Sequence, residues 1–132
     1  MKKSIIISAI ALCFSLGTVH ANPVNPSKYT LEQVKYSKVN SFCVSIALGD
    51  IDTVTKLLSF GEDANGFSNG MTPAMYAAKF NRTEILELLI EHGADLKIKS
   101  AKRMTAVKYA KIHGAKDAEI IIKETIASEK KK

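Results

Sequence analysis

The sequence has few of the residues from which catalytic and metal sites are built. It contains two cysteines and three histidines in 132 residues. His92 and His113 lie far apart, and neither has a second histidine four positions away, as a metal-binding helix would. No glycine-rich loop leads into a helix with a lysine at the phosphate-binding spacing. The sequence therefore predicts no metal, no small-molecule cofactor and no catalytic residue.

The charge balance does not indicate a nucleic-acid partner. The formal net charge is +6, but two of the lysines lie at the extreme N-terminus and three at the C-terminus. No basic stripe is interleaved with aromatic residues, as is typical of nucleic-acid-binding surfaces. We expect residues 128–132 to form a solvated basic tail and the protein to have no nucleic-acid partner.

The first 21 residues have the pattern of a secretory signal peptide. A lysine pair precedes the apolar run SIIISAIALCFSLG, which is too short for a typical spanning helix. Val19 and Ala21 then provide the small residues of a cleavage site after Ala21. We expect residues 1–21 to be removed and residues 22–29 to form a linker. The mature protein would then be periplasmic or secreted from a bacterium, with no membrane attachment.

Two alternatives to a cleaved leader stay open, an uncleaved anchor and a lipoprotein. A lipoprotein signal needs a small residue before Cys13, and Leu12 occupies that position. After cleavage Cys43 is the single cysteine left, so no intramolecular disulfide is expected. Cys43 lies in the apolar run SFCVSIALG, which predicts that its thiol is buried.

Two alignments of the sequence with itself indicate a repeat of 32 to 33 residues. A shift of 32 places LLSFGEDAN, residues 57–65, on LIEHGADLK, residues 89–97. A shift of 33 places TPAMYAAKFN, residues 72–81, on TAVKYAKIHG, residues 105–114. A fixed period of this length is typical of proteins whose units bury their apolar faces against one another.

The middle unit is predicted to contain two short helices, at about 73–80 and 82–91. Thr72 is a suitable N-cap. Pro73 suits the first helical position, because its missing N–H would be unpaired there in any residue.

The second helix of this unit has an apolar stripe and a defined end. Ile85, Leu88 and Leu89 follow the spacing of one helical face. Gly93 is placed to end the helix in the left-handed conformation. Before the first helix, Asn69-Gly70 predicts a tight turn of the kind that closes a hairpin.

The middle unit resembles an ankyrin repeat. The family pattern Thr-Pro-Leu-His-x-Ala-Ala reads TPAMYAA at residues 72–78, and the later Leu-Leu and Gly-Ala-Asp elements stand at 88–89 and 93–95. The resemblance covers roughly residues 39–126. It implies an all-α ankyrin-repeat solenoid of about three helix-turn-helix repeats. We place this domain at residues 30–127.

The sequence also departs from the family pattern. Met75 replaces the family's histidine, so the hydrogen-bond bracing of that residue is expected to be absent. The loop at 65–72 is one residue shorter than the loop at 97–105, which predicts a blunted finger. The last unit has Ala106 where the family has proline. An extra N-terminal helix is expected at about 30–38, where TLEQ forms a capping-box pattern.

The resemblance implies a protein-binding scaffold and not an enzyme. In this family partners contact the loops between repeats, called fingers, and the concave face formed by the first helices. The positions that match these surfaces are Phe67, Met71, Tyr76, Lys79, Phe80, Arg103, Met104, Tyr109 and His113, with Ser68, Asn69, Lys102 and Ile112 also expected to be exposed. Aromatic residues, Met and Arg are enriched at such interfaces.

Several alternatives stay open for the function. Phe80 and Tyr109 could instead pack between repeats. A pairing of Cys43 with His113 is rejected because the two lie in the first and last units, and the carboxylates Glu84, Glu87 and Glu91 are typical of a solvated outer face. The partner would be another protein. The protein could act as a binding scaffold, as the inhibitor of one enzyme, or as an accessory factor of a periplasmic enzyme.

Overall fold

The structure is a computed structural model that describes residues 39–132. This range contains six helices: α3 (Ser41–Leu48), α4 (Ile51–Ser59), α5 (Pro73–Lys79), α6 (Thr83–Glu91), α7 (Ala106–Ile112) and α8 (Lys116–Glu129). The predicted all-α solenoid of three repeats is confirmed. The expected signal peptide (1–21), linker (22–29) and helix at about 30–38 lie outside the described residues. None of the six helices is long and apolar enough to cross a membrane.

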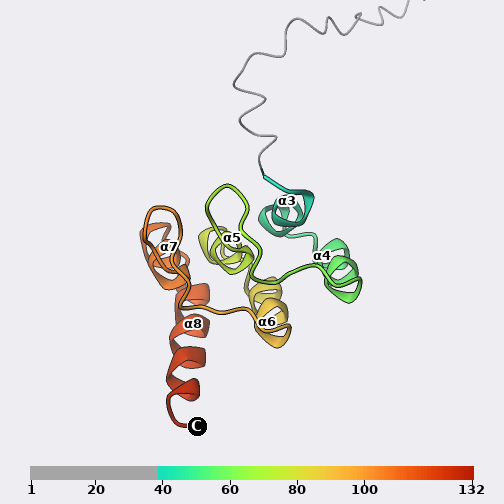
Figure 1. Ribbon diagram of the computed structural model, residues 1–132. Coiled ribbons are helices and arrows are strands. Elements are labelled where there is room, and N and C mark those ends of the chain that lie inside the picture. The colour runs from blue at the N-terminus through green and yellow to red at the C-terminus, as the bar shows by residue number, and fades with distance from the viewer. Residues whose placement is uncertain (1–38) are drawn as a thin grey trace, which may run out of the picture. The chain divides into compact units, whose positions relative to one another are not determined.

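The helices form two layers (Figure 1). The inner layer holds the first helix of each repeat, with α5 packed between α3 and α7. The outer layer holds the second helices, with α6 packed between α4 and α8. The two fingers rise beside α5 and α7. We call residues 65–72 the first finger and residues 97–105 the second finger.

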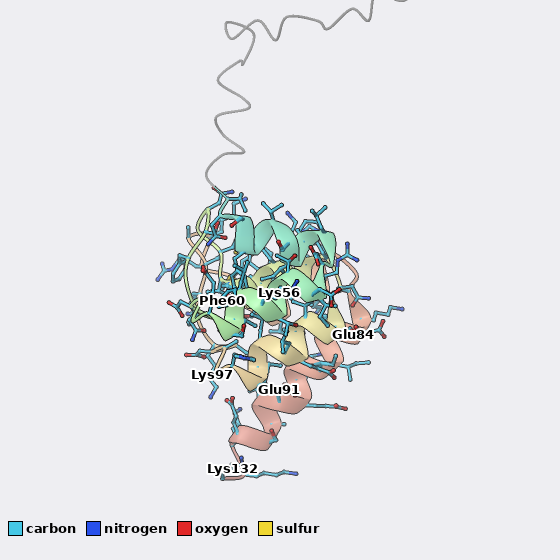
Figure 2. The ribbon with its side chains drawn as sticks, turned by 90° about the vertical axis from the view of Figure 1, so that its right-hand side faces the viewer. Lys56, Phe60, Glu84, Glu91, Lys97 and Lys132 are labelled. Atoms are coloured by element: carbon cyan, nitrogen blue, oxygen red, sulfur yellow. The ribbon has the colours of Figure 1, made fainter. Side chains whose placement is uncertain are left out.

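Figure 2 views the stack from the side of the first repeat and shows several outer-layer side chains. Lys56 lies on α4, and Phe60 follows that helix with 84% of its surface exposed. Glu84 and Glu91 lie near the two ends of α6 and are both exposed. The predicted solvated outer face is therefore present.

Local capping rules account for where the helices begin and end. Asn40 accepts a hydrogen bond from the Cys43 amide at 2.9 Å and starts α3. Thr72 and Pro73 start α5 as expected. Gly93 has a φ of 86° and follows the end of α6, which confirms its predicted left-handed conformation. The sequence patterns thus set the bounds of the middle repeat to within a residue or two.

The core runs between the layers and consists mainly of aliphatic residues and alanines, with Phe42 and Met75 also fully buried. Ile46, Leu86 and Leu89 are fully buried, and Ala77 and Ala110 let the inner helices approach closely. Cys43 is also fully buried, as expected. Burial raises the pKa of its thiol to about 11, so the thiol stays protonated and unreactive at neutral pH.

Met75 partly replaces the hydrogen bonding that the family's histidine would supply. Its Sδ accepts a hydrogen bond from the Thr72 amide at 3.4 Å. The buried Thr72 Oγ1, however, has no hydrogen-bond partner among the described residues. The sulfur therefore satisfies the Thr72 amide, while the Thr72 hydroxyl stays without a partner.

Polar side chains fasten each repeat to the next. Asn65 accepts from the Asp95 amide at 2.7 Å and donates to the Gly93 carbonyl at 3.0 Å. Asn81 accepts from the Ala118 amide at 3.1 Å and so fastens the middle repeat to the last. Asn65 thus joins the first repeat to the middle one and Asn81 joins the middle repeat to the last, from different positions in the repeat.

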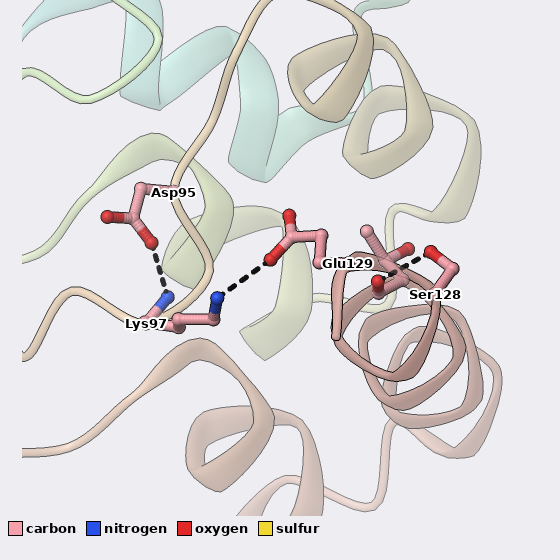
Figure 3. A network of polar contacts seen from close by, with 5 residues as sticks. Asp95, Lys97, Ser128 and Glu129 are labelled. Carbon is pink, nitrogen blue, oxygen red and sulfur yellow. Dashed lines mark hydrogen bonds and ion pairs between the residues drawn. The ribbon is translucent and has the colours of Figure 1, made fainter. Parts of the chain in front are cut away.

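The end of the chain is fastened in the same way (Figure 3). Lys97 forms an ion pair with Glu129 at 2.9 Å. The Asp95 carboxylate accepts from the Lys97 amide at 2.8 Å and holds the loop in place. Helix α8 ends at Glu129, so it includes the first two residues of the segment 128–132 that was expected to be a tail.

Candidate functional site

A groove of about 460 Å³ lies between the two fingers and the inner helices behind them. Two backbone segments form its walls, residues 69–71 of the first finger and 101–104 of the second. The C-terminal ends of α5 and α7 form its floor. Its lining residues are Asn69, Gly70, Met71, Lys79, Ala101, Lys102, Met104, Tyr109, Ile112 and His113.

The first finger is a short hairpin, as Asn69-Gly70 predicted. Ser68 and Met71 exchange backbone hydrogen bonds of 2.9 and 3.1 Å. Asn69 and Gly70 have φ values of 51° and 75°, the two positive values that such a turn needs. The finger is a formed hairpin although it is one residue shorter than the second.

The second finger leans directly on the first. The Ala101 amide donates to the Gly70 carbonyl at 2.8 Å. A Cβ at position 70 would stand only 2.8 Å from the Ala101 Cβ. Gly70 is therefore required both by its φ and by this close approach.

Ser100 organises the second finger. Its amide donates to the Met104 carbonyl at 2.9 Å. Its hydroxyl oxygen accepts from the amides of Lys102 and Met104, each at 3.2 Å. The Tyr109 hydroxyl donates to the same oxygen at 3.1 Å. The finger is thus fixed to the helix that follows it.

Five of the nine expected binding residues come together in the groove: Met71, Lys79, Met104, Tyr109 and His113. Met71 and Met104 are partly buried and present apolar surface to it. Ile112, also expected to be exposed, adds an apolar side chain that is 56% exposed. The groove therefore has an apolar interior.

The other four expected residues do not line the groove. Phe67 and Phe80 are exposed, at 57% and 41%. Lys79 reaches over the Phe80 ring, with its ammonium 5.3 Å from the centroid, a distance that suits a cation–π contact. Arg103 is exposed on the second finger, between two residues that do line the groove.

The expectation that Tyr76 is exposed is wrong, and Tyr109 follows the alternative in which it packs inside the stack. They are only 7% and 5% exposed. The Tyr76 hydroxyl donates to the Ser68 carbonyl at 3.0 Å, just as that of Tyr109 bonds to Ser100. Each tyrosine is covered because it fastens its own finger to the helix behind it. Ser68 is buried for the same reason, at 4% exposed, against expectation.

Sequence reasoning missed how the charges are distributed. The fingers and their inner helices, residues 65–80 and 97–113, contain seven lysines and arginines and no aspartate or glutamate. The outer helices α4, α6 and α8 contain eight acidic and three basic residues. The signal is present in the sequence, but it emerges only when charges are sorted by their position in the repeat.

A second hollow lies on the outer layer, between α6 and α8. It is lined by Glu87, Ile90, Glu91, Ile121, Glu124 and Thr125. Its three carboxylates give it the opposite charge to the groove between the fingers. In residues 39–132 no three His, Cys, Asp or Glu side chains are grouped so that they could hold a metal ion.

Comparison with known proteins agrees with the repeat architecture. A family model described as "Ankyrin repeats (3 copies)" matches residues 42–131. The chain is 30% identical over 87 residues to an ankyrin repeat, SAM and basic leucine zipper domain-containing protein 1 from Nomascus leucogenys. It is 36% identical over 85 residues to the human NAD-capped RNA hydrolase NUDT12. These matches cover 65% and 63% of this chain but only 18% of each relative.

Proposed function

Because the chain belongs to the ankyrin-repeat family, whose repeats are typically non-catalytic scaffolds for protein–protein interaction, we propose that it binds another protein in the groove between its two fingers. The observation that carries this proposal is the apolar interior of the groove. Ile112 is exposed there beside Met71 and Met104. Exposed apolar surface with a polar rim commonly marks a partner site.

The groove also has the rigidity that binding requires. Hydrogen bonds from Ala101 to Gly70 and from Tyr109 to Ser100 hold its two walls at a fixed separation. A preorganised site loses little conformational entropy when a partner binds. Its volume of about 460 Å³ suits a few side chains of a partner segment and not a whole domain.

We propose no enzymatic activity for the chain. Its match to the NAD-capped RNA hydrolase covers 18% of that protein, a share that fits a common repeat segment better than a common catalytic domain. Whether the partner is an enzyme that the protein inhibits or one that it assists depends on the partner's identity. Both roles use the same groove.

We also propose that the protein is exported, with cleavage after Ala21. The support is the sequence pattern of residues 1–21, a lysine pair followed by an apolar run and small residues. A mature N-terminus at Asn22 is the expected result, and mature protein that retains Met1 would contradict it.

A photo-crosslinking residue at position 112 should capture a protein partner in cells of the native host. The matched control is position 120, because Ile112 and Ile120 are 56% and 53% exposed and only Ile112 lines the groove. We expect a discrete adduct from position 112 and none from position 120, as seen by electrophoresis and mass spectrometry. Adducts from position 120 alone would place the partner on the outer layer.

A further inference from the structure

We infer that the partner segment bound in the groove is acidic, with an apolar side chain flanked by aspartate or glutamate, and that Arg103 is a specificity-determining residue for it. The inference rests on the proposed function and extends it to the chemistry of the partner. It is carried by the charge of the groove and by the backbone conformation of Arg103.

The positive groups around the groove have no carboxylate partners among residues 39–132. The ion pairs in residues 39–132 are Lys97–Glu129 and Lys123–Glu119. Neither involves Lys79, Lys102 or Arg103, and no carboxylate lines the groove. Lys79 and Lys102 therefore line the groove without a counter-charge, and Arg103 lies beside it on the second finger. Carboxylates on a partner would provide the counter-charge. Complementary charge of this kind sets the choice of partner more than raw affinity.

Arg103 adopts a conformation that an arginine rarely takes. Its φ is 61°, in the left-handed region. In the repeat alignment it occupies the position of Gly70, whose φ is 75°. Glycine adopts this region without the steric cost that a side chain adds. A glycine at position 103 would therefore fold more stably.

Nothing inside the described part of the chain accounts for the arginine. Its side chain is exposed and has no hydrogen bond or ion pair among residues 39–132. Strain that persists at the rim of a site without an internal contact points to a function. A guanidinium at this position can bind a partner carboxylate in bidentate geometry.

The same features favour a protein segment over a nucleic acid. Single-stranded nucleic acids bind by stacking bases on exposed aromatic rings. No phenylalanine or tryptophan lines the groove, and its tyrosine, Tyr109, is 5% exposed and cannot offer its face. The interior is instead formed by Met71, Met104 and Ile112. Such a surface suits an aliphatic or aromatic side chain, with carboxylates reaching the cations at the rim.

Selection from a random peptide library against the full chain tests the inference. We expect the selected peptides to carry Asp or Glu on either side of a large apolar residue. Their affinity should fall about five- to tenfold in Arg103→Gly and in Lys102→Gln, which corresponds to about 1–1.4 kcal/mol. It should stay unchanged in Lys56→Gln, which removes an exposed lysine from the outer layer. Arg103→Gly should at the same time raise the melting temperature, because it relieves the strain.

Each of the other outcomes would overturn a different one of these claims. Neutral or basic peptides whose binding is blocked by Ile112→Glu would refute the acidic partner and leave the groove as the binding site. Peptides that bind the Ile112→Glu variant as tightly as the parent chain would refute both the groove as the binding site and the acidic partner. Tighter binding of an oligonucleotide or of vesicles with anionic lipid, lost in Arg103→Gly, would refute a protein segment. A lower melting temperature for Arg103→Gly would refute the strain argument.

Discussion

Replacing Leu89 with alanine should lower the free energy of unfolding by about 2–5 kcal/mol. Leu89 is fully buried in α6, the outer helix of the middle repeat. Helix α6 contacts α4, α5 and α8, so a cavity there loosens all three repeats. Urea denaturation followed by circular dichroism gives the value.

Leu48 provides a matched control within the same chain. It is a leucine at the end of a helix, and 73% of its surface is exposed. Leu48→Ala should change the free energy of unfolding by no more than about 0.5 kcal/mol. Equal losses for the two variants would show that α6 is not packed as the structure has it.

Gly70→Ala should destabilise the protein by about 2–4 kcal/mol, because two costs add. The first is the left-handed backbone, with a φ of 75°. The second is the steric conflict of the new methyl group with the Ala101 Cβ, 2.8 Å away. Thermal unfolding measures the sum. The second finger must also move away from the first, so the variant should lose the shape of the groove.

Gly93→Ala separates these two costs. Gly93 has a similar φ of 86°, but a Cβ there would meet no atom within 4 Å. The variant should therefore lose only the conformational part, about 1–2 kcal/mol. If Gly70→Ala costs no more than Gly93→Ala, the fingers do not touch as closely as the structure shows.

The features that were predicted correctly depend on short-range rules. Pro73 at a helix start, Gly93 after a helix end and Asn69-Gly70 in a turn each follow from the local backbone geometry that these residues favour. Leu89 and Cys43 follow from helical periodicity and apolar surroundings. The resemblance to a repeat family then assembles these local elements into a stack.

The burial pattern of α6 shows where periodicity is insufficient. The expected stripe was Ile85, Leu88 and Leu89, but Leu86 is fully buried and Leu88 only partly. A single stripe assumes one neighbour, whereas α6 has neighbours on three sides. The buried surface of α6 is therefore wider than a single stripe, and its centre is shifted from Leu88 toward Leu86.

The tyrosines show a second limit. A repeat alignment places Tyr76 and Tyr109 on the inner helices, but it does not show what covers them. Their hydroxyl groups bond to the fingers of their own repeats, so burial depends on loop geometry. For this reason Tyr76→Ala would test the stability of the fold and not partner binding. The exposed Ile112 is the better probe of binding.

The affinity of the crosslinked partner for two variants tests the groove assignment most directly. Ile112→Glu places a charge in the apolar interior of the groove, and Ile120→Glu places the same charge at an equally exposed site on α8. By isothermal titration calorimetry, Ile112→Glu should weaken binding by about tenfold or more, the loss of about 1.4 kcal/mol or more expected when an interface anchor is replaced. Ile120→Glu should bind as the parent chain does. Unchanged affinity for Ile112→Glu together with lost affinity for Ile120→Glu would contradict the groove assignment.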